Sequence, residues 1–105
     1  PVWLIVSACY SGSLIPALQQ PQRLVMTAAS SERPSFGCGD RSPNTWFVRE
    51  LHDALAAGGD WNRVWSATQA QVLAREQAMK FQPSEPQRQI GAGWQQRLDR
   101  PWREF

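Results

Sequence analysis

The chain has 105 residues, of which 42% are hydrophobic, and a formal net charge of +2. This length corresponds to one domain and is enough to bury a core. The charge is mild and its arginines are scattered until the tail, which argues against nucleic-acid binding through a basic face. No apolar run approaches the roughly 20 residues that a membrane span requires.

The first predicted element is a strand over residues 2–6, a short apolar run typical of a fully buried central strand in a parallel sheet. Small residues follow it, and helical spacing begins at Leu14. Cys9 is therefore expected at a strand carboxyl end and beside a helix N-terminus. Reacting groups collect at such strand ends, and the helix N-terminus favours a thiolate.

Cys9 has other possible interpretations. Free cysteines are often buried and inert. A phosphatase-type anion loop would need a basic residue six positions later, where Ile15 stands. A nucleophile elbow would need glycines at the positions of Ser7 and Ser11. A disulfide between Cys9 and Cys38 would disable the thiol, and the sequence leaves that pairing open.

Several blocks of the chain resemble the legumain-type cysteine peptidases (peptidase C13 family, caspase-like clan), particularly their bacterial branch. The blocks lie in the family's order, over about residues 2–57 with a further segment at 86–91. They are Ser-Ala-Cys-Tyr-Ser-Gly-Ser at 7–13, Leu-Val-Met-Thr-Ala-Ala at 24–29, Ser-Phe-Gly-Cys at 35–38 and Thr-Trp-Phe at 45–47.

The resemblance implies an α/β fold, a caspase-like three-layer sandwich with a mostly parallel sheet. The run at 24–29 is then a second strand parallel to the first, and residues 87–90 form a later strand. The chain opens with Pro1, directly at what should be a central strand. We therefore expect only the C-terminal part of this domain in residues 1–91, followed by a polar and aromatic tail at 92–105.

The resemblance also implies a chemistry. Cys9 would attack a peptide carbonyl of a peptide or protein substrate to give a thioester, which water hydrolyses. The backbone N–H of Cys9 and another near the catalytic histidine would hold the oxyanion. The family's catalytic histidine precedes the cysteine strand, so we expect it upstream of residue 1 and the chain alone to be inactive. No cofactor is implied.

Three substrate-binding residues are carried over by position. Ser35, in the long loop at 30–44, matches a pocket serine. Ser7 stands where legumain has a pocket acid, and Arg49 stands where many relatives have another acid. With both acids replaced, the legumain preference for asparagine or aspartate is not inherited.

The single histidine, His52, falls in a helix predicted over about 45–57. We interpret it as a partly exposed helix residue and not as the base. Metal binding is not predicted, because the candidate ligands Cys9, Cys38, Asp40 and His52 include no close pair.

Asp60 is a predicted N-cap for a second helix, whose helical stripe comprises Trp61, Val64, Trp65, Thr68, Val72 and Met79. Trp61 and Trp65 are interpreted as core anchors. The tail carries Trp94, Leu98, Trp102 and Phe105 among arginines. Spacing leaves open whether this tail docks on the body of the protein, on a partner or on a membrane.

Two further functions stay open at this stage. One is a non-catalytic caspase-like binding or assembly module, which Arg49 in place of an acid favours. The other is a transamidase that uses the same acyl-enzyme. Membrane association, through a segment before Pro1 or through the tail, also stays open, as do compartment and oligomeric state.

Overall fold

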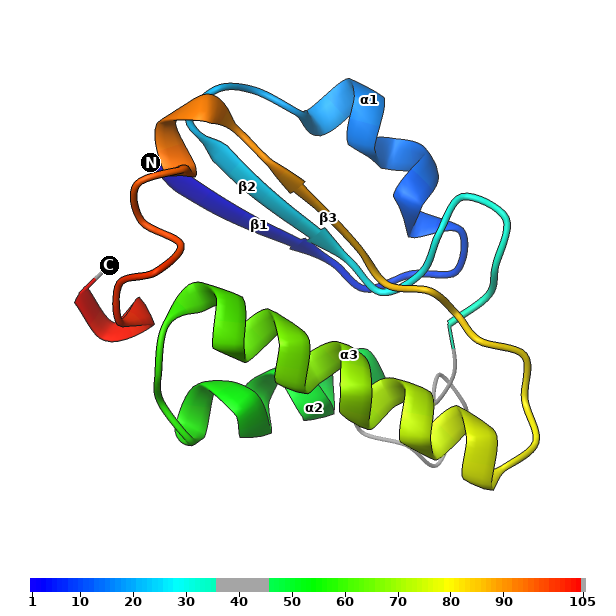
Figure 1. Ribbon diagram of the computed structural model, residues 1–105. Helices are drawn as coiled ribbons and strands as arrows, with labels where there is room; N and C mark the ends of the chain where they lie inside the picture. The colour runs from blue at the N-terminus through cyan, green and yellow to red at the C-terminus, as the bar shows by residue number, and fades with distance from the viewer. Residues whose placement is uncertain (36–45, 105) are drawn as a thin grey trace.

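The computed structural model describes residues 1–35 and 46–104. They form three layers, with α1 on one face of a sheet and α2 with α3 on the other (Figure 1). The helices and strands are, in order, β1 (Val2–Val6), α1 (Ile15–Leu18), β2 (Arg23–Thr27), α2 (Trp46–Ala56), α3 (Trp61–Ala78) and β3 (Gln87–Ile90). Three 3-10 turns lie at Ser11–Leu14, Ala92–Trp94 and Trp102–Glu104. The α/β three-layer prediction is confirmed.

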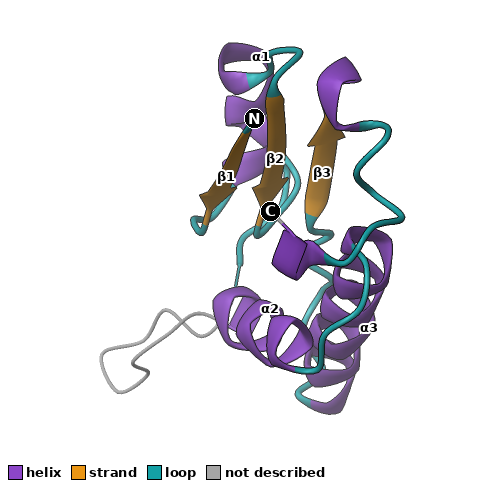
Figure 2. Ribbon diagram, turned by 90° about the vertical axis from the view of Figure 1, so that its left-hand side faces the viewer, coloured by secondary structure: helices purple, strands orange, loops and turns teal. Residues whose placement is uncertain are grey.

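The sheet is mixed, with β2 between β1 and β3 (Figure 2). β1 and β2 run parallel, from Val2 opposite Arg23 to Val6 opposite Thr27. β3 runs antiparallel to β2 and ends with Ile90 opposite Leu24. The predicted strands at 24–29 and 87–90 are therefore confirmed. The carboxyl ends of β1 and β2 and the amino end of β3 lie at the same end of the sheet.

The prediction that residues 2–6 form a fully buried central strand is wrong for the described sheet. Val2 and Ile5 of β1 are 44% and 42% exposed, whereas Leu24, Val25 and Met26 of β2 are completely buried. The physical reason is that β1 has a hydrogen-bonded neighbour on one side only within the described residues. An apolar, β-branched composition favours a pleated surface but does not fix a strand's place in the sheet.

The core lies between the sheet and the α2–α3 pair, and tryptophans dominate one end of it. Trp61, at the start of α3, is 1% exposed. Its ring makes edge-to-face contacts with Trp3 of β1 and with Trp94, at centroid distances of 4.9 and 5.0 Å. Trp65 is buried as well. Both predicted core anchors are confirmed.

The helix boundaries follow the expected signals. α2 buries Phe47, Leu51 and Ala54 along one stripe. The Asp60 side chain caps α3 by accepting a hydrogen bond from the Arg63 amide at 2.7 Å. Met79 was expected in the buried stripe of this helix, and this is wrong: α3 ends at Ala78, and Met79 is 57% exposed.

The tail docks on the body of the protein, one of the three alternatives left open above. Trp94 is fully buried, and its indole N–H donates to the carbonyl of Gln22 at 3.0 Å. The Trp102 indole donates to the carbonyl of Leu55 at the end of α2, at 2.9 Å. The last described residues thus lie against the α2–α3 connection (Figure 1). None of the helices in the described residues is long and apolar enough to cross a membrane.

Candidate active site

Cys9 lies in the turn between β1 and the 3-10 turn Ser11–Leu14. It is a free cysteine and its side chain is exposed. The interpretation as a buried, inert cysteine is therefore wrong. The expected position of Cys9, at the carboxyl end of a strand and just before helical turns, is confirmed. Cys38, its alternative disulfide partner, lies outside the described residues.

Backbone hydrogen bonds hold this turn against the segment that follows β2. The Tyr10 amide donates to the carbonyl of Arg33 at 2.9 Å, and the Gly12 amide donates to the carbonyl of Ala29 at 2.8 Å. The hydroxyl of buried Ser11 accepts from the Ala29 amide at 3.2 Å. These bonds fix where the exposed thiol is presented.

Two backbone features show how tightly this turn is built. Tyr10 has a φ of 58°, in the left-handed region, which costs a non-glycine residue about 1–2 kcal/mol. At Gly12 a Cβ would lie 2.8 Å from the Ser31 nitrogen and 2.9 Å from the Ser30 carbonyl carbon. Glycine is therefore needed at position 12 for close backbone approach, beside a strained residue that follows the cysteine.

Ser35 is brought to Cys9 from 26 residues along the chain. The Cys9 sulfur lies 3.5 Å from the Ser35 carbonyl oxygen, to which the thiol donates, and 3.9 Å from the Ser35 hydroxyl. Ser35 is 7% exposed. Ser7, two positions before the cysteine, is half-buried. Of the three residues expected from the sequence to bind substrate, Ser35 therefore contacts the thiol, and Ser7 precedes it by two residues along the chain.

Arg49 and His52 are placed differently. Arg49 is exposed on α2 and makes no hydrogen bond or ion pair within the described residues. The His52 side chain is 80% exposed, and its Nδ1 lies 3.4 Å from a carboxylate oxygen of Asp53. The interpretation of His52 as an exposed helix residue is confirmed.

The described residues hold no group of three or more metal-ligating side chains. Asp40 lies outside them, as does Cys38.

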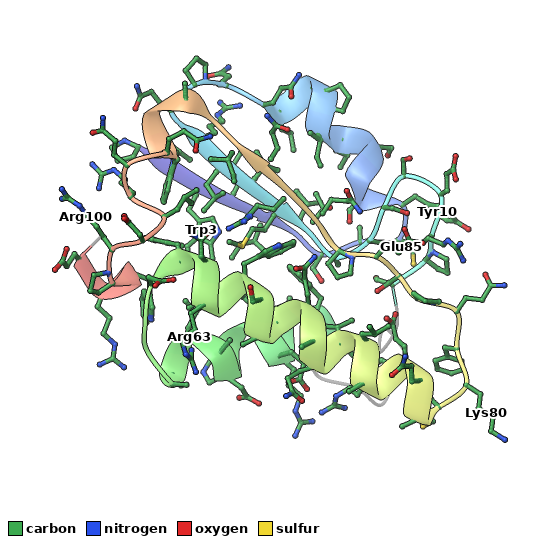
Figure 3. The ribbon with its side chains drawn as sticks, viewed as in Figure 1. Trp3, Tyr10, Arg63, Lys80, Glu85 and Arg100 are labelled. Carbon is green, nitrogen blue, oxygen red and sulfur yellow. The ribbon has the colours of Figure 1, made fainter. Side chains whose placement is uncertain are left out.

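Arg33 and Glu85, which lie behind the Cys9 turn, were not predicted from the sequence. The Arg33 guanidinium forms an ion pair with Glu85 at 3.3 Å and donates to the Gln82 side chain at 2.9 Å. The backbone carbonyl of Arg33 accepts the hydrogen bond from the Tyr10 amide. Tyr10 and Glu85 lie on the same side of the molecule in Figure 3. Neither Arg33 nor Glu85 belongs to a periodic pattern, so no sequence signal marked the pair.

Arg88, on β3, is a separate electrostatic feature. Its guanidinium lies 5.5 Å from the centre of a Trp65 ring and donates to the Asn62 side chain at 3.0 Å. Burial lowers the pKa of Arg88 from its ordinary value, because desolvation disfavours the charged form.

Comparison with known proteins gives one family match. The model of the peptidase C13 family matches residues 2–91, which include β1, the Cys9 turn, both long helices and β3. The comparison with curated proteins gives no match.

Proposed function

Because the chain belongs to the peptidase C13 family, a family of cysteine peptidases, we propose that Cys9 is the nucleophile of a cysteine-type endopeptidase. The observation that carries the proposal is a free, exposed thiol at the carboxyl end of β1, inside the region that matches the family. The described core does not bury this sulfur, so a peptide can reach it.

In the proposed reaction the Cys9 thiolate attacks the carbonyl carbon of the scissile peptide bond. A carbon–sulfur bond forms, the carbon–nitrogen bond breaks, and an imidazolium gives its proton to the leaving amine. Water then hydrolyses the thioester and restores the thiol. The Cys9 backbone N–H is the proposed oxyanion donor within this chain, a role worth roughly 3 kcal/mol of transition-state stabilisation.

The general base of this proposal comes from outside the chain. The chain has one histidine, His52, and its ring is exposed on α2 and pairs with Asp53. The proposal therefore assigns proton transfer to a histidine that precedes Pro1 in the complete polypeptide. This chain supplies the nucleophile and part of the substrate pocket.

Ser35 and Ser7 are the proposed pocket residues. The short contact between Ser35 and the Cys9 sulfur supports this role for Ser35, since a bound peptide must lie within the same few ångströms. Hydroxyl-bearing serines in place of a carboxylate favour a neutral polar side chain over a basic one. Arg49 stays a prediction as a pocket residue.

The test uses the polypeptide encoded by the complete reading frame and a library of internally quenched peptides. We expect Cys9→Ala to lower kcat/KM by roughly 10⁴-fold or more, as for other nucleophile deletions. Cys38→Ala, the matched control, should retain turnover. The opposite pattern, with loss in Cys38→Ala and not in Cys9→Ala, would contradict the assignment.

The same assay separates the two remaining functions. Products joined to an added amine, in place of free carboxylates, would identify a transamidase. Peptide binding without turnover, unchanged in Cys9→Ala, would identify a binding module.

A further inference from the structure

We propose that a cavity beside the C-terminal half of α3 binds the side chain of a lysine or arginine in a polypeptide. The cavity, called here the Glu76 pocket, has a volume of about 340 Å³. Its lining residues are Gln69, Leu73, Glu76, Pro83, Glu85 and Pro86. The proposal is independent of the role assigned to Cys9.

The carboxylate of Glu76 is the main reason for this assignment. Glu76 is 1% exposed, and its Oε2 accepts a hydrogen bond from the Ser84 amide at 2.8 Å. Its Oε1 has no hydrogen-bond or ion-pair partner within the described residues, although Glu76 lines the cavity. Among the described residues only Trp3 Nε1 is a buried side-chain polar atom without a partner, so Glu76 Oε1 is not sealed from solvent and can be reached through the cavity. A cation that enters would pair with this oxygen in surroundings less polar than bulk water, where the attraction between opposite charges is stronger.

The pocket is built from one helix face and the segment that leads to β3. Gln69, Leu73 and Glu76 are spaced by four and three residues, so they share a face of α3. The returning segment is held to the helix because the Phe81 amide donates to the Glu76 carbonyl at 2.8 Å. This segment runs beside the C-terminal half of α3 before it reaches β3 (Figure 1).

The walls of the pocket suit an alkyl chain. Leu73 is 41% exposed, and Pro83 and Pro86 offer ring carbons and no amide N–H. Lysine and arginine combine methylene groups with a cationic end, so their stems can lie on these walls while the cation reaches Glu76. A neutral alkyl side chain would leave the carboxylate unpaired, and an anion would be repelled.

Two arginines of the described residues, which interact with this part of the chain, already have carboxylate partners. Arg33 pairs with Glu85, and Arg75 pairs with Glu50 at 2.8 Å. Glu85 at the wall of the pocket is therefore partly neutralised, whereas Glu76 is not. This contrast identifies Glu76 as the residue that binds the incoming cation.

The test uses the isotope-labelled polypeptide encoded by the complete reading frame. It is titrated with three blocked tripeptides, Ac-Ala-X-Ala-NH₂, where X is lysine, arginine or norleucine. We expect the lysine and arginine peptides to shift the NMR signals of Leu73, Glu76 and the Ser84 amide. They should bind at least about tenfold more tightly than the norleucine peptide, as expected for a hydrogen bond to a charged group.

Two variants test the residues. Glu76→Gln keeps an acceptor for the Ser84 amide but removes the charge, so the preference for lysine over norleucine should disappear. Leu73→Lys introduces a cation at an exposed helix position and should block binding without altering Glu76. Ala74→Lys makes the same charge change at the next, also exposed, residue of α3 and should bind like the parent chain.

Equal binding of the lysine and norleucine peptides would overturn the proposal, as would an unchanged preference in Glu76→Gln. If Glu76→Gln does not fold, the comparison of Leu73→Lys with Ala74→Lys tests the proposal instead. Equal binding of the lysine peptide by these two variants would overturn it. Pentylamine serves as a probe without a peptide backbone. Binding of pentylamine as tight as that of the lysine peptide would overturn the assignment to a polypeptide side chain.

Discussion

The two ends of the sheet are built differently. At the end where β3 finishes, Trp61 and Trp94 are almost fully buried, and Trp94 donates a hydrogen bond to the Gln22 carbonyl. At the other end, Cys9 is exposed and Tyr10, which follows it, is 51% exposed with a left-handed backbone. The chain therefore places its largest apolar contacts away from the thiol.

This difference indicates a division between stability and chemistry. Burial of a tryptophan removes a large apolar area from water and adds favourable edge-to-face contacts. The Cys9 turn instead depends on backbone hydrogen bonds and one close glycine contact, which fix position without covering the sulfur. Substitutions at the two ends should therefore separate loss of folding from loss of reactivity.

The largest expected effect is at the tryptophan end. Trp61→Ala removes a 1%-exposed indole that contacts Trp3 and Trp94, and should lower the free energy of unfolding by about 3–5 kcal/mol. Urea unfolding followed by far-UV circular dichroism measures it. Phe81→Ala, an aromatic truncation at a 43%-exposed position, should cost clearly less. Equal losses in the two variants would contradict the difference between the ends.

The next effect is at the thiol end. Gly12→Ala places a Cβ 2.8 Å from the Ser31 nitrogen, and backbone cannot yield as a side-chain tip can. We expect a loss of about 1–3 kcal/mol in unfolding free energy, as for overpacking, and an altered rate of Cys9 alkylation. Gln20→Ala, at an exposed position outside this turn, should change both quantities little. An unchanged alkylation rate in Gly12→Ala would mean that this contact does not position the thiol.

A smaller effect is expected at the start of α3. Asp60→Ala removes the acceptor of the Arg63 amide hydrogen bond, so unfolding should become easier by about 1 kcal/mol. Asp60→Asn retains a side-chain oxygen that can cap the helix, and should keep most of that stability. Protection of the Arg63 amide from hydrogen exchange reports the cap directly. Equal exchange in the two variants would show that the cap is not the cause.

The sequence predicted the elements whose signals are local. Asp60 before an apolar stripe marked α3, and the short run at 87–90 before a glycine marked β3, both as observed. The predictions that β1 is fully buried and that Met79 belongs to the buried stripe of α3 were wrong. The order of strands in a sheet and the end of a helix both depend on neighbours that are distant in the sequence. The position of Cys9 at a strand end was predicted from the small residues that follow an apolar run.

The Glu76 pocket was not predicted, although a signal was present. Glu76 follows Val72 by four residues and so continues the buried stripe of α3 with a charged side chain. A carboxylate in such a stripe marks a site where a polar partner is needed. In the structure the Ser84 amide is one such partner. The sequence does not indicate this contact, because the 80–86 segment has no periodicity. The prediction that Ser35 is a pocket residue likewise depended on the family resemblance alone.

The smallest expected effect on stability is at Cys9 itself. Because the thiol is exposed, Cys9→Ser should change the unfolding free energy by no more than about 0.5 kcal/mol. The same substitution should abolish iodoacetamide labelling of the peptide that contains residue 9, measured by mass spectrometry. A loss of 2 kcal/mol or more, on the scale of removing a buried group, would mean that the sulfur contributes to packing. The thiol end would then resemble the tryptophan end, and the assignment of Cys9 as a nucleophile would lose its structural basis.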